Sequence, residues 1–250
     1  MIICNSHNFA VTRAQKTGGA SLEMYMLESG LVDHTNDIYT LEGGFANWEE
    51  FKAYSAAHDN LNYSELPREL YGYEYLKDAQ KTYHEVVADG QASPDMPWVG
   101  TIRNPLEWLA SLYYYANVRR KITAMEHVKK FGRMLPEDIF NSVHMSEPDP
   151  SWDLIFVEMP DNQSVVDSLK AQTSYYPDHA QLFNIENIHE HATNFIQAKG
   201  GTVAGRIEVR KSDNDPIYYL ANLSEDRKQK SLEMYEKDFL AWEAAYAKYN

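Results

Sequence analysis

A lysine placed just before two glycines is the first feature of the sequence that could do chemistry. The stretch RAQKTGGASLEMY, residues 13–25, runs from Lys16 through small residues into the start of an expected helix. The phosphate loop of ATP-binding proteins has its lysine after the glycines instead. The stretch therefore indicates an anion site that differs from a loop for the phosphates of ATP.

This turn contains the parts of an anion cradle. Its backbone N–H groups would lie unpaired at the start of a helix, beside the positive end of the helix dipole. Gly18 and Gly19 would let a tetrahedral group approach the backbone closely. Thr17 and Ser21 would add hydroxyl donors, and Lys16 would add a positive charge. The alternative is a tight Gly-Gly turn with a solvated lysine.

A second candidate site lies in TIRNPLEWLASLYYY, residues 101–115. Arg103 would end a strand, at the edge where open α/β sheets bind ligands. Ser111 follows about two helical turns later, and an arginine fork with a hydroxyl suits a terminal phosphate. The alternative is that Arg103 pairs with a surface carboxylate and that Ser111 only packs.

The elements that must position these residues alternate between strand and helix. Three segments are expected to be strands: 8–14, 97–103 and 182–188. A helix would follow the first strand from near Ser21 to Gly30, and another would follow the second, capped by Asn104. The alternation predicts a single α/β domain over residues 1–250, with a mainly parallel sheet.

Further helices are expected elsewhere in the chain. Residues 45–90 look mainly helical, with Asn47 as a cap, and a helix after the third strand would end at Gly200. The last segment is predicted to be one long helix capped by Ser224. Its apolar residues, at three-four spacing, would form one buried stripe: Leu232, Tyr235, Phe239, Trp242 and Tyr246.

Composition and charge argue against several functions. The chain is 44% hydrophobic and 24% charged, and its net charge of −14 disfavours binding to duplex DNA, RNA or anionic lipid. Cys4 is the only cysteine, which rules out an internal disulfide and a multi-cysteine metal site. The first residues lack the pattern of a signal peptide, and no window reaches the ~18 apolar residues of a membrane span. We expect a cytoplasmic protein without nucleic-acid or membrane partners.

The two candidate sites together resemble a known family. Lys-Thr-Gly-Gly-x-Ser-Leu after one strand, then Arg-Asn-Pro-x5-Ser-x-Tyr-Tyr after a later one, is similar to the sulfotransferases that use 3′-phosphoadenosine 5′-phosphosulfate (PAPS), above all their carbohydrate-type branch. Residues 58–67, 171–188 and 223–243 resemble further segments of that branch. The resemblance implies a three-layer, P-loop-like fold in which a central, mainly parallel sheet is flanked by helices.

The resemblance also implies a role for each motif. Six residues would hold the 5′-phosphosulfate of PAPS: Lys16, Thr17, Gly18, Gly19, Ala20 and Ser21. Arg103 and Ser111 would hold its 3′-phosphate, and Lys16 would stabilise the charge that grows on the leaving phosphate oxygen. Two positions depart from the family pattern, since Gln15 replaces a frequent proline and Ala20 replaces a common threonine.

A base should take the proton of the acceptor group. His58 is the first candidate, because a neutral imidazole accepts a proton near pH 7 and some relatives have a histidine before the second motif. The alternative is a surface or helix-end histidine. Asp37 and Glu42 are carboxylate candidates, since other relatives use an acid after the first motif.

Three further sets of residues could belong to the site or could have only a structural or solvent-exposed role. Arg210 and Lys211 would form a basic loop over the 3′-phosphate, or a solvated charge pair. Trp48 and tyrosines 113–115 could line an acceptor pocket, although such aromatic residues are more often core. His189 and His191, two apart on an expected helix, are interpreted as surface residues.

The predicted activity follows from the resemblance. The chain would be a sulfotransferase that moves a sulfuryl group in line from PAPS to a hydroxyl or amine of a small-molecule or carbohydrate acceptor. PAP would be the product, and no metal would be needed. A non-catalytic module that binds PAP or a nucleotide is one alternative. A P-loop kinase is another, which would need a lysine after the glycines and an aspartate at a strand end.

Overall fold

The structure is a computed structural model, and it divides the chain into two compact units. The first unit contains Met1–Arg103, Ala171–Asp213 and Lys237–Asn250, and the second contains Asn104–Lys170 and Asn214–Glu236. The structure describes seven parts of the chain: residues 1–14, 16–39, 48–57, 81–113, 171–203, 205 and 225–248.

A five-stranded mixed sheet forms the centre of the first unit. Its strands, in the order β3-β1-β2-β4-β5, are β1 (Ile2–Cys4), β2 (Phe9–Val11), β3 (Ile38–Tyr39), β4 (Trp98–Ile102) and β5 (Gln181–Asn184). β2, β4 and β5 run parallel, whereas β1 is antiparallel to both β2 and β3. The three expected strands are confirmed, but the sheet is mixed rather than mainly parallel because β1 and β3 join one side of it.

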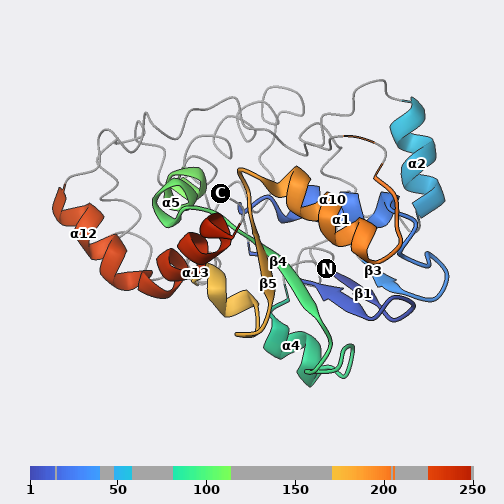
Figure 1. The fold of residues 1–250 in the computed structure, drawn as a ribbon, viewed down its shortest axis with the longest axis horizontal. Coiled ribbons are helices and arrows are strands. Elements are labelled where there is room, and N and C mark those ends of the chain that lie inside the picture. Colours follow the sequence, from blue (N-terminus) through green and yellow to red (C-terminus); the bar gives the residue numbers. More distant parts are fainter. Residues whose placement is uncertain are drawn as a thin grey trace, which may run out of the picture. The chain divides into compact units, whose positions relative to one another are not determined.

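Helices cover both faces of this sheet. The first unit contains α1 (Gly19–Glu28), α2 (Trp48–Ala57), α4 (Tyr83–Ala88), the 3₁₀ helix η4 (Gln172–Tyr175), α10 (Ile188–Ala198) and α13 (Glu236–Ala247) from its second residue on. Alternate strand residues point to opposite sides, as the pleat of a strand requires. Phe9 and Val11 pack with residues of α1 and α10, whereas Ala10 and Trp98 pack with Val86 of α4. Figure 1 shows the ribbons of α1, α10 and α4 beside the strands of the sheet.

The expected helix ends are largely confirmed. α1 begins two residues before Ser21, buries Leu22 and Met26, and ends before Gly30, whose φ of 76° suits glycine. In the second unit, α5 (Pro105–Tyr113) begins at the expected proline. Its first N–H groups are capped by Asn104, whose Oδ1 accepts hydrogen bonds from the backbone of Leu106 at 3.0 Å and Glu107 at 3.4 Å.

The prediction of one long C-terminal helix is wrong. The segment forms α12 (Glu225–Met234) in the second unit and α13, with a break at Tyr235. The expected buried stripe does not form either, since Leu232 and Tyr246 are exposed, while Asp238 is fully buried. The buried carboxylate of Asp238 accepts hydrogen bonds from the start of η4, which compensate for the loss of contact with water.

None of the described helices is long and apolar enough to cross a membrane.

Candidate functional site

The lysine-glycine turn and Arg103 follow neighbouring parallel strands. β2 pairs with β4 in the register Ala10 to Trp98 and Val11 to Val99, so both strands end at the same edge of the sheet. The turn comes after β2, and Arg103 comes directly after β4. A hydrogen bond of 2.8 Å between the hydroxyls of Thr17 and Thr101 joins the turn to the end of β4. The structure therefore brings the turn and the backbone of Arg103 to one place, as expected.

The turn has an unusual backbone conformation. Lys16 has a φ of 61° and Gly18 a φ of 85°, both in the left-handed region. A left-handed lysine is strained by about 1–3 kcal/mol, which neighbouring structure must offset, and such strain is often found at ligand sites. Gly18 is the N-cap of α1, so the N–H groups of Gly19 and Ala20 lie in its first turn, where no intrahelical acceptor exists. This is a suitable geometry for an anion.

The two glycines also have a packing role that the sequence argument did not contain. A Cβ on Gly18 would lie 2.9 Å from Cγ1 of Ile185, and one on Gly19 would lie 2.4 Å from Cβ of Arg13. Both distances are too short for real Cβ contacts. Side chains of the protein itself thus account for both glycines.

The hydroxyl of Thr17 does not face a ligand. It is fully buried, donates to the carbonyl of Ala14 at 2.9 Å, and contacts Thr101. The expectation that this hydroxyl adds a donor to the cradle is therefore corrected, because the group is used to hold the turn on the sheet. Ser21 is buried as well, and its N–H donates to the carbonyl of Gly18 at 3.0 Å.

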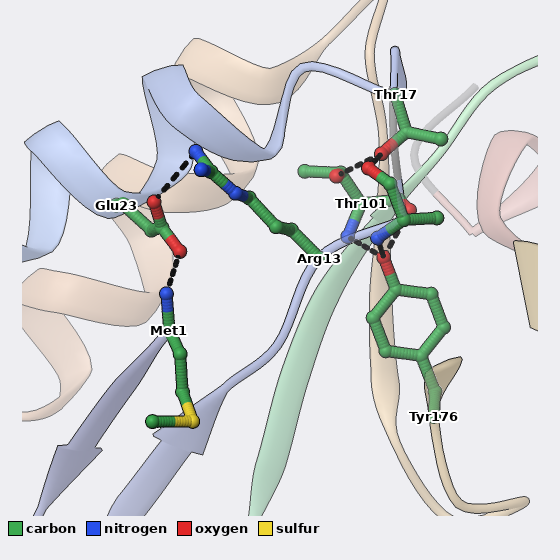
Figure 2. A network of polar contacts seen from close by, with 7 residues as sticks. Met1, Arg13, Thr17, Glu23, Thr101 and Tyr176 are labelled. Carbon is green, nitrogen blue, oxygen red and sulfur yellow. Dashed lines mark hydrogen bonds and ion pairs between the residues drawn. The ribbon is translucent and has the colours of Figure 1, made fainter. Parts of the chain in front are cut away.

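A buried tyrosine holds the same two strand ends together. The hydroxyl of Tyr176 accepts hydrogen bonds from the N–H groups of Ala14 at 3.0 Å and Thr101 at 3.3 Å, and donates to the carbonyl of Thr101 at 2.8 Å (Figure 2). Burial raises the pKa of this phenol, and its hydrogen bonds oppose the rise. Its ring lies over Gly100 in β4. Tyr176 therefore fixes the base of the turn.

Near the turn, two buried ion pairs connect α1 with Met1, just before β1, and with Arg13, just after β2. Arg13 and Glu23 form a 2.9 Å salt bridge, and the other carboxylate oxygen of Glu23 contacts the amino group of Met1 (Figure 2). All three residues are buried. Arg13, although close in sequence to Lys16, is thus engaged in a buried ion pair with Glu23 and has a structural role here.

The amide of Gln172 holds the backbone of Arg103. Its Oε1 accepts from the N–H of Arg103 at 2.9 Å, and its Nε2 donates to the carbonyl of the same residue at 3.0 Å. Gln172 is fully buried, and its own N–H donates to Asp238 of α13 at 2.7 Å. Neither Gln172 nor Asp238 was predicted from the sequence to have a role. The only available signal was the resemblance of residues 171–188 to a segment of the sulfotransferase family.

The position of Asp37 does not fit a base at the turn. Its carboxylate accepts hydrogen bonds from the N–H groups of Asn5, Ser6 and Asp33, and from the side chains of Ser6 and Cys4. Cys4 is the last residue of β1, and Asn5 and Ser6 follow it, at the end of the sheet where Cys4 pairs with Phe9 at the start of β2. Asp37 is therefore at the opposite edge of the sheet from the turn.

The predictions for three other residues can be compared with the structure. His191 is fully buried, with its ring edge-on to Phe183, so its interpretation as a surface residue is wrong. His189 is half-buried, and its Nδ1 lies 2.9 Å from the hydroxyl of Tyr25. Trp48 is buried in the core beside α1, in agreement with a core aromatic.

Of the remaining predicted site residues, the structure describes Ser111 but not the other four. Ser111 is half-buried on α5 in the second unit. Four candidates lie outside the described residues: Glu42, His58, Arg210 and Lys211. Within the described parts of the chain, no group of three or more His, Cys, Asp or Glu side chains could hold a metal ion.

Comparison of this chain with protein-family models, with curated proteins and with solved structures finds no match.

Proposed function

We propose that this chain is a PAPS-dependent sulfotransferase acting on a hydroxyl or amine of a small-molecule or carbohydrate acceptor. The observation that carries the proposal is the shared strand edge, where the lysine-glycine turn follows β2 and Arg103 follows the adjacent parallel strand β4. Neighbouring strands lie about 4.8 Å apart, so one nucleotide can contact both ends. Helices on both faces of the sheet support a three-layer, P-loop-like arrangement.

The turn suits the 5′-phosphosulfate of the donor. Its first helical N–H groups and the dipole of α1 favour the two linked tetrahedral groups of the phosphosulfate, each of which carries a negative charge. Lys16 precedes the glycines and would lie beside the bridging oxygen between sulfur and the 5′-phosphate. There its ammonium group would stabilise the negative charge of the leaving phosphate.

The reaction is a direct displacement at sulfur. The bond from sulfur to the bridging oxygen of the 5′-phosphate breaks, a bond from sulfur to the acceptor oxygen or nitrogen forms, and the acceptor proton passes to a base. PAP leaves with the electrons of the broken bond. His58 and Glu42 remain candidates for the base, and Arg103 with Ser111 remains the predicted set for the 3′-phosphate.

The proposal is tested first by binding. We expect PAP to raise the thermal stability of the chain, by ~2.7 kcal/mol at a hundred times its Kd, and ATP with Mg²⁺ to have a smaller effect. Stabilisation by ATP with Mg²⁺ but not by PAP would contradict the proposal and favour a kinase.

The second test is transfer from labelled PAPS to a panel of sugars, phenols and amines. Lys16→Ala should abolish transfer while leaving the folded structure intact. Lys52→Ala is a matched control, because Lys52 is an exposed lysine of α2 that pairs with Glu49. Tight PAP binding without transfer to any acceptor would favour a non-catalytic PAP-binding module, and full transfer by the Lys16 variant would refute the role of that lysine.

A further inference from the structure

The backbone of Arg103, the first residue after β4, is hydrogen-bonded to a side chain and not to a neighbouring strand. The ladder between β4 and β5 ends with the bond from the N–H of Ile185 to the carbonyl of Ile102. The next residue, Arg103, has both its N–H and its carbonyl paired with the single amide of Gln172, at 2.9 and 3.0 Å. The primary amide thus replaces a peptide group of a neighbouring strand and extends the ladder by one residue.

The backbone that carries this amide is in turn held by hydrogen bonds to Asp238. Gln172 begins η4, and its N–H donates to Oδ2 of Asp238 at 2.7 Å. Oδ1 of Asp238 accepts from the N–H of Thr173 at 2.9 Å and from its hydroxyl at 2.6 Å. Gln172 and Asp238 are both fully buried. A buried polar group whose hydrogen bonds are satisfied has little freedom to move, since every other arrangement leaves a donor or an acceptor unpaired.

We infer that Gln172 is a positioning residue that sets the direction of Arg103 toward the 3′-phosphate of the nucleotide, and this rests on the proposed function. With its N–H and carbonyl both held, Arg103 has one backbone conformation, and the direction of its side chain from Cα is fixed. An arginine held in this way loses less conformational freedom when it binds a phosphate.

Only an amide can do this at position 172. Glutamine offers an acceptor to the N–H and a donor to the carbonyl at the same time. A glutamate would place an oxygen against the carbonyl of Arg103, and an apolar residue would leave two polar backbone groups unpaired.

The test compares PAP with AMP, which lacks the 3′-phosphate, by calorimetric binding to the full chain. We expect PAP to bind tighter than AMP, and Arg103→Ala to remove that difference. Gln172→Met, which keeps the length of the side chain, should weaken PAP binding roughly tenfold and leave AMP binding within about twofold. In the double variant the two losses should not add, because both act on one contact.

Two further variants control for damage to the fold. Ser174→Ala changes an exposed hydroxyl in η4 that bonds only locally, to the carbonyl of Ala171, and should leave both affinities unchanged. If Gln172→Met does not fold, Asp238→Asn replaces it. This variant keeps one acceptor oxygen but removes the acceptor for the N–H of Gln172, and it should weaken PAP binding selectively.

The outcomes separate this inference from the proposed function. Wild-type chain that binds PAP no better than AMP would refute the proposed role of Arg103, and with it the 3′-phosphate site. Wild-type preference for PAP that survives Gln172→Met would refute the inference alone. An equal loss of PAP and AMP affinity would also refute it, because a purely structural role predicts that result.

Discussion

At the scale of single residues, Gly100 is constrained by an aromatic ring. A Cβ at this position would lie 2.0 Å from Cε1 of Tyr176, well inside any real carbon contact. Glycine in a strand is usually a weakness, and its replacement by alanine often stabilises a protein. Here the ring fills the space above β4, because its hydroxyl must reach the backbone of Thr101 and Ala14.

We therefore expect Gly100→Ala to destabilise the chain. Overpacking of a rigid core costs about 1–3 kcal/mol, and here it would also strain the tyrosine that fixes the turn. The measurement is the free energy of unfolding in urea. Gly205→Ala is the control, since a Cβ at Gly205 meets nothing within 4 Å. An equal effect of the two substitutions would show that the ring is free to move away.

Asp37 gives a prediction with a defined pH dependence. Burial acts to raise the pKa of its carboxyl group, but the Ser6 hydroxyl and the N–H groups of Asp33 and Ser6 outweigh burial, and the pKa is lowered. A carboxyl group with a lowered pKa in the folded state stabilises it above the unfolded pKa, about 3.9, and this stabilisation is lost as pH falls through the folded pKa.

Asp37→Asn should therefore lower the free energy of unfolding most at about pH 7 and progressively less toward about pH 3. Urea unfolding at several pH values measures this difference. Asp95→Asn, at an exposed aspartate, is the matched control and should have a small effect throughout. A loss of the same size at both ends of the pH range would show that shape, rather than charge, makes Asp37 important.

The sequence predicted which residues lie near the candidate site better than it predicted the directions of their side chains. The lysine-glycine turn and Arg103 were selected from motif and spacing, and the structure brings them to one edge. The inward hydroxyl of Thr17 could not be predicted, because its direction depends on Thr101, 84 residues later. The role of Gln172 depends in the same way on Arg103, 69 residues earlier in the chain.

At the scale of elements, local signals were sufficient where they were strong. Asn104-Pro105 predicted the start of α5, and Gly30 and Gly200 predicted the ends of helices. β1 and β3, with three and two residues, are too short for a visible alternation; β1 forms by pairing with the edge of β2, and β3 forms by pairing with β1. The break at Tyr235 could not be predicted either, since the helical spacing continues through it.

The cap of α5 gives a test at this scale. Asn104→Ala should lower the free energy of unfolding by about 1 kcal/mol, because the first N–H groups of the helix lose their acceptor, and Asn104→Asp should retain most of the stability. Asn187 precedes α10 but makes no side-chain capping bond, so Asn187→Ala should cost less. Chemical denaturation measures all three variants, and a larger loss at Asn187 would contradict the assignment of the cap.

At the scale of the whole molecule, the proposed ligand and the chain have charges of the same sign. The net charge of the chain is −14, while each phosphate monoester of PAP carries about −1.5 to −2 near neutral pH. Long-range repulsion should therefore slow the approach of the ligand, and Lys16 with Arg103 should attract it only at short range. Salt distinguishes these two ranges, because the Debye length falls from about 30 Å at 0.01 M to about 8 Å at 0.15 M.

We expect the association rate constant of PAP to rise as salt is added over this range, and the dissociation rate constant to change less, since contacts in the bound state are short. Stopped-flow binding measures both constants. AMP, with one phosphate, is the matched ligand, and its association rate should rise by a smaller factor because the repulsion it experiences is weaker. A fall in the association rate of PAP with salt would show that the positive charges at the strand edge dominate the field that the ligand meets. In that case the acidic surface would lie away from the path of entry, and the repulsion argument would be wrong.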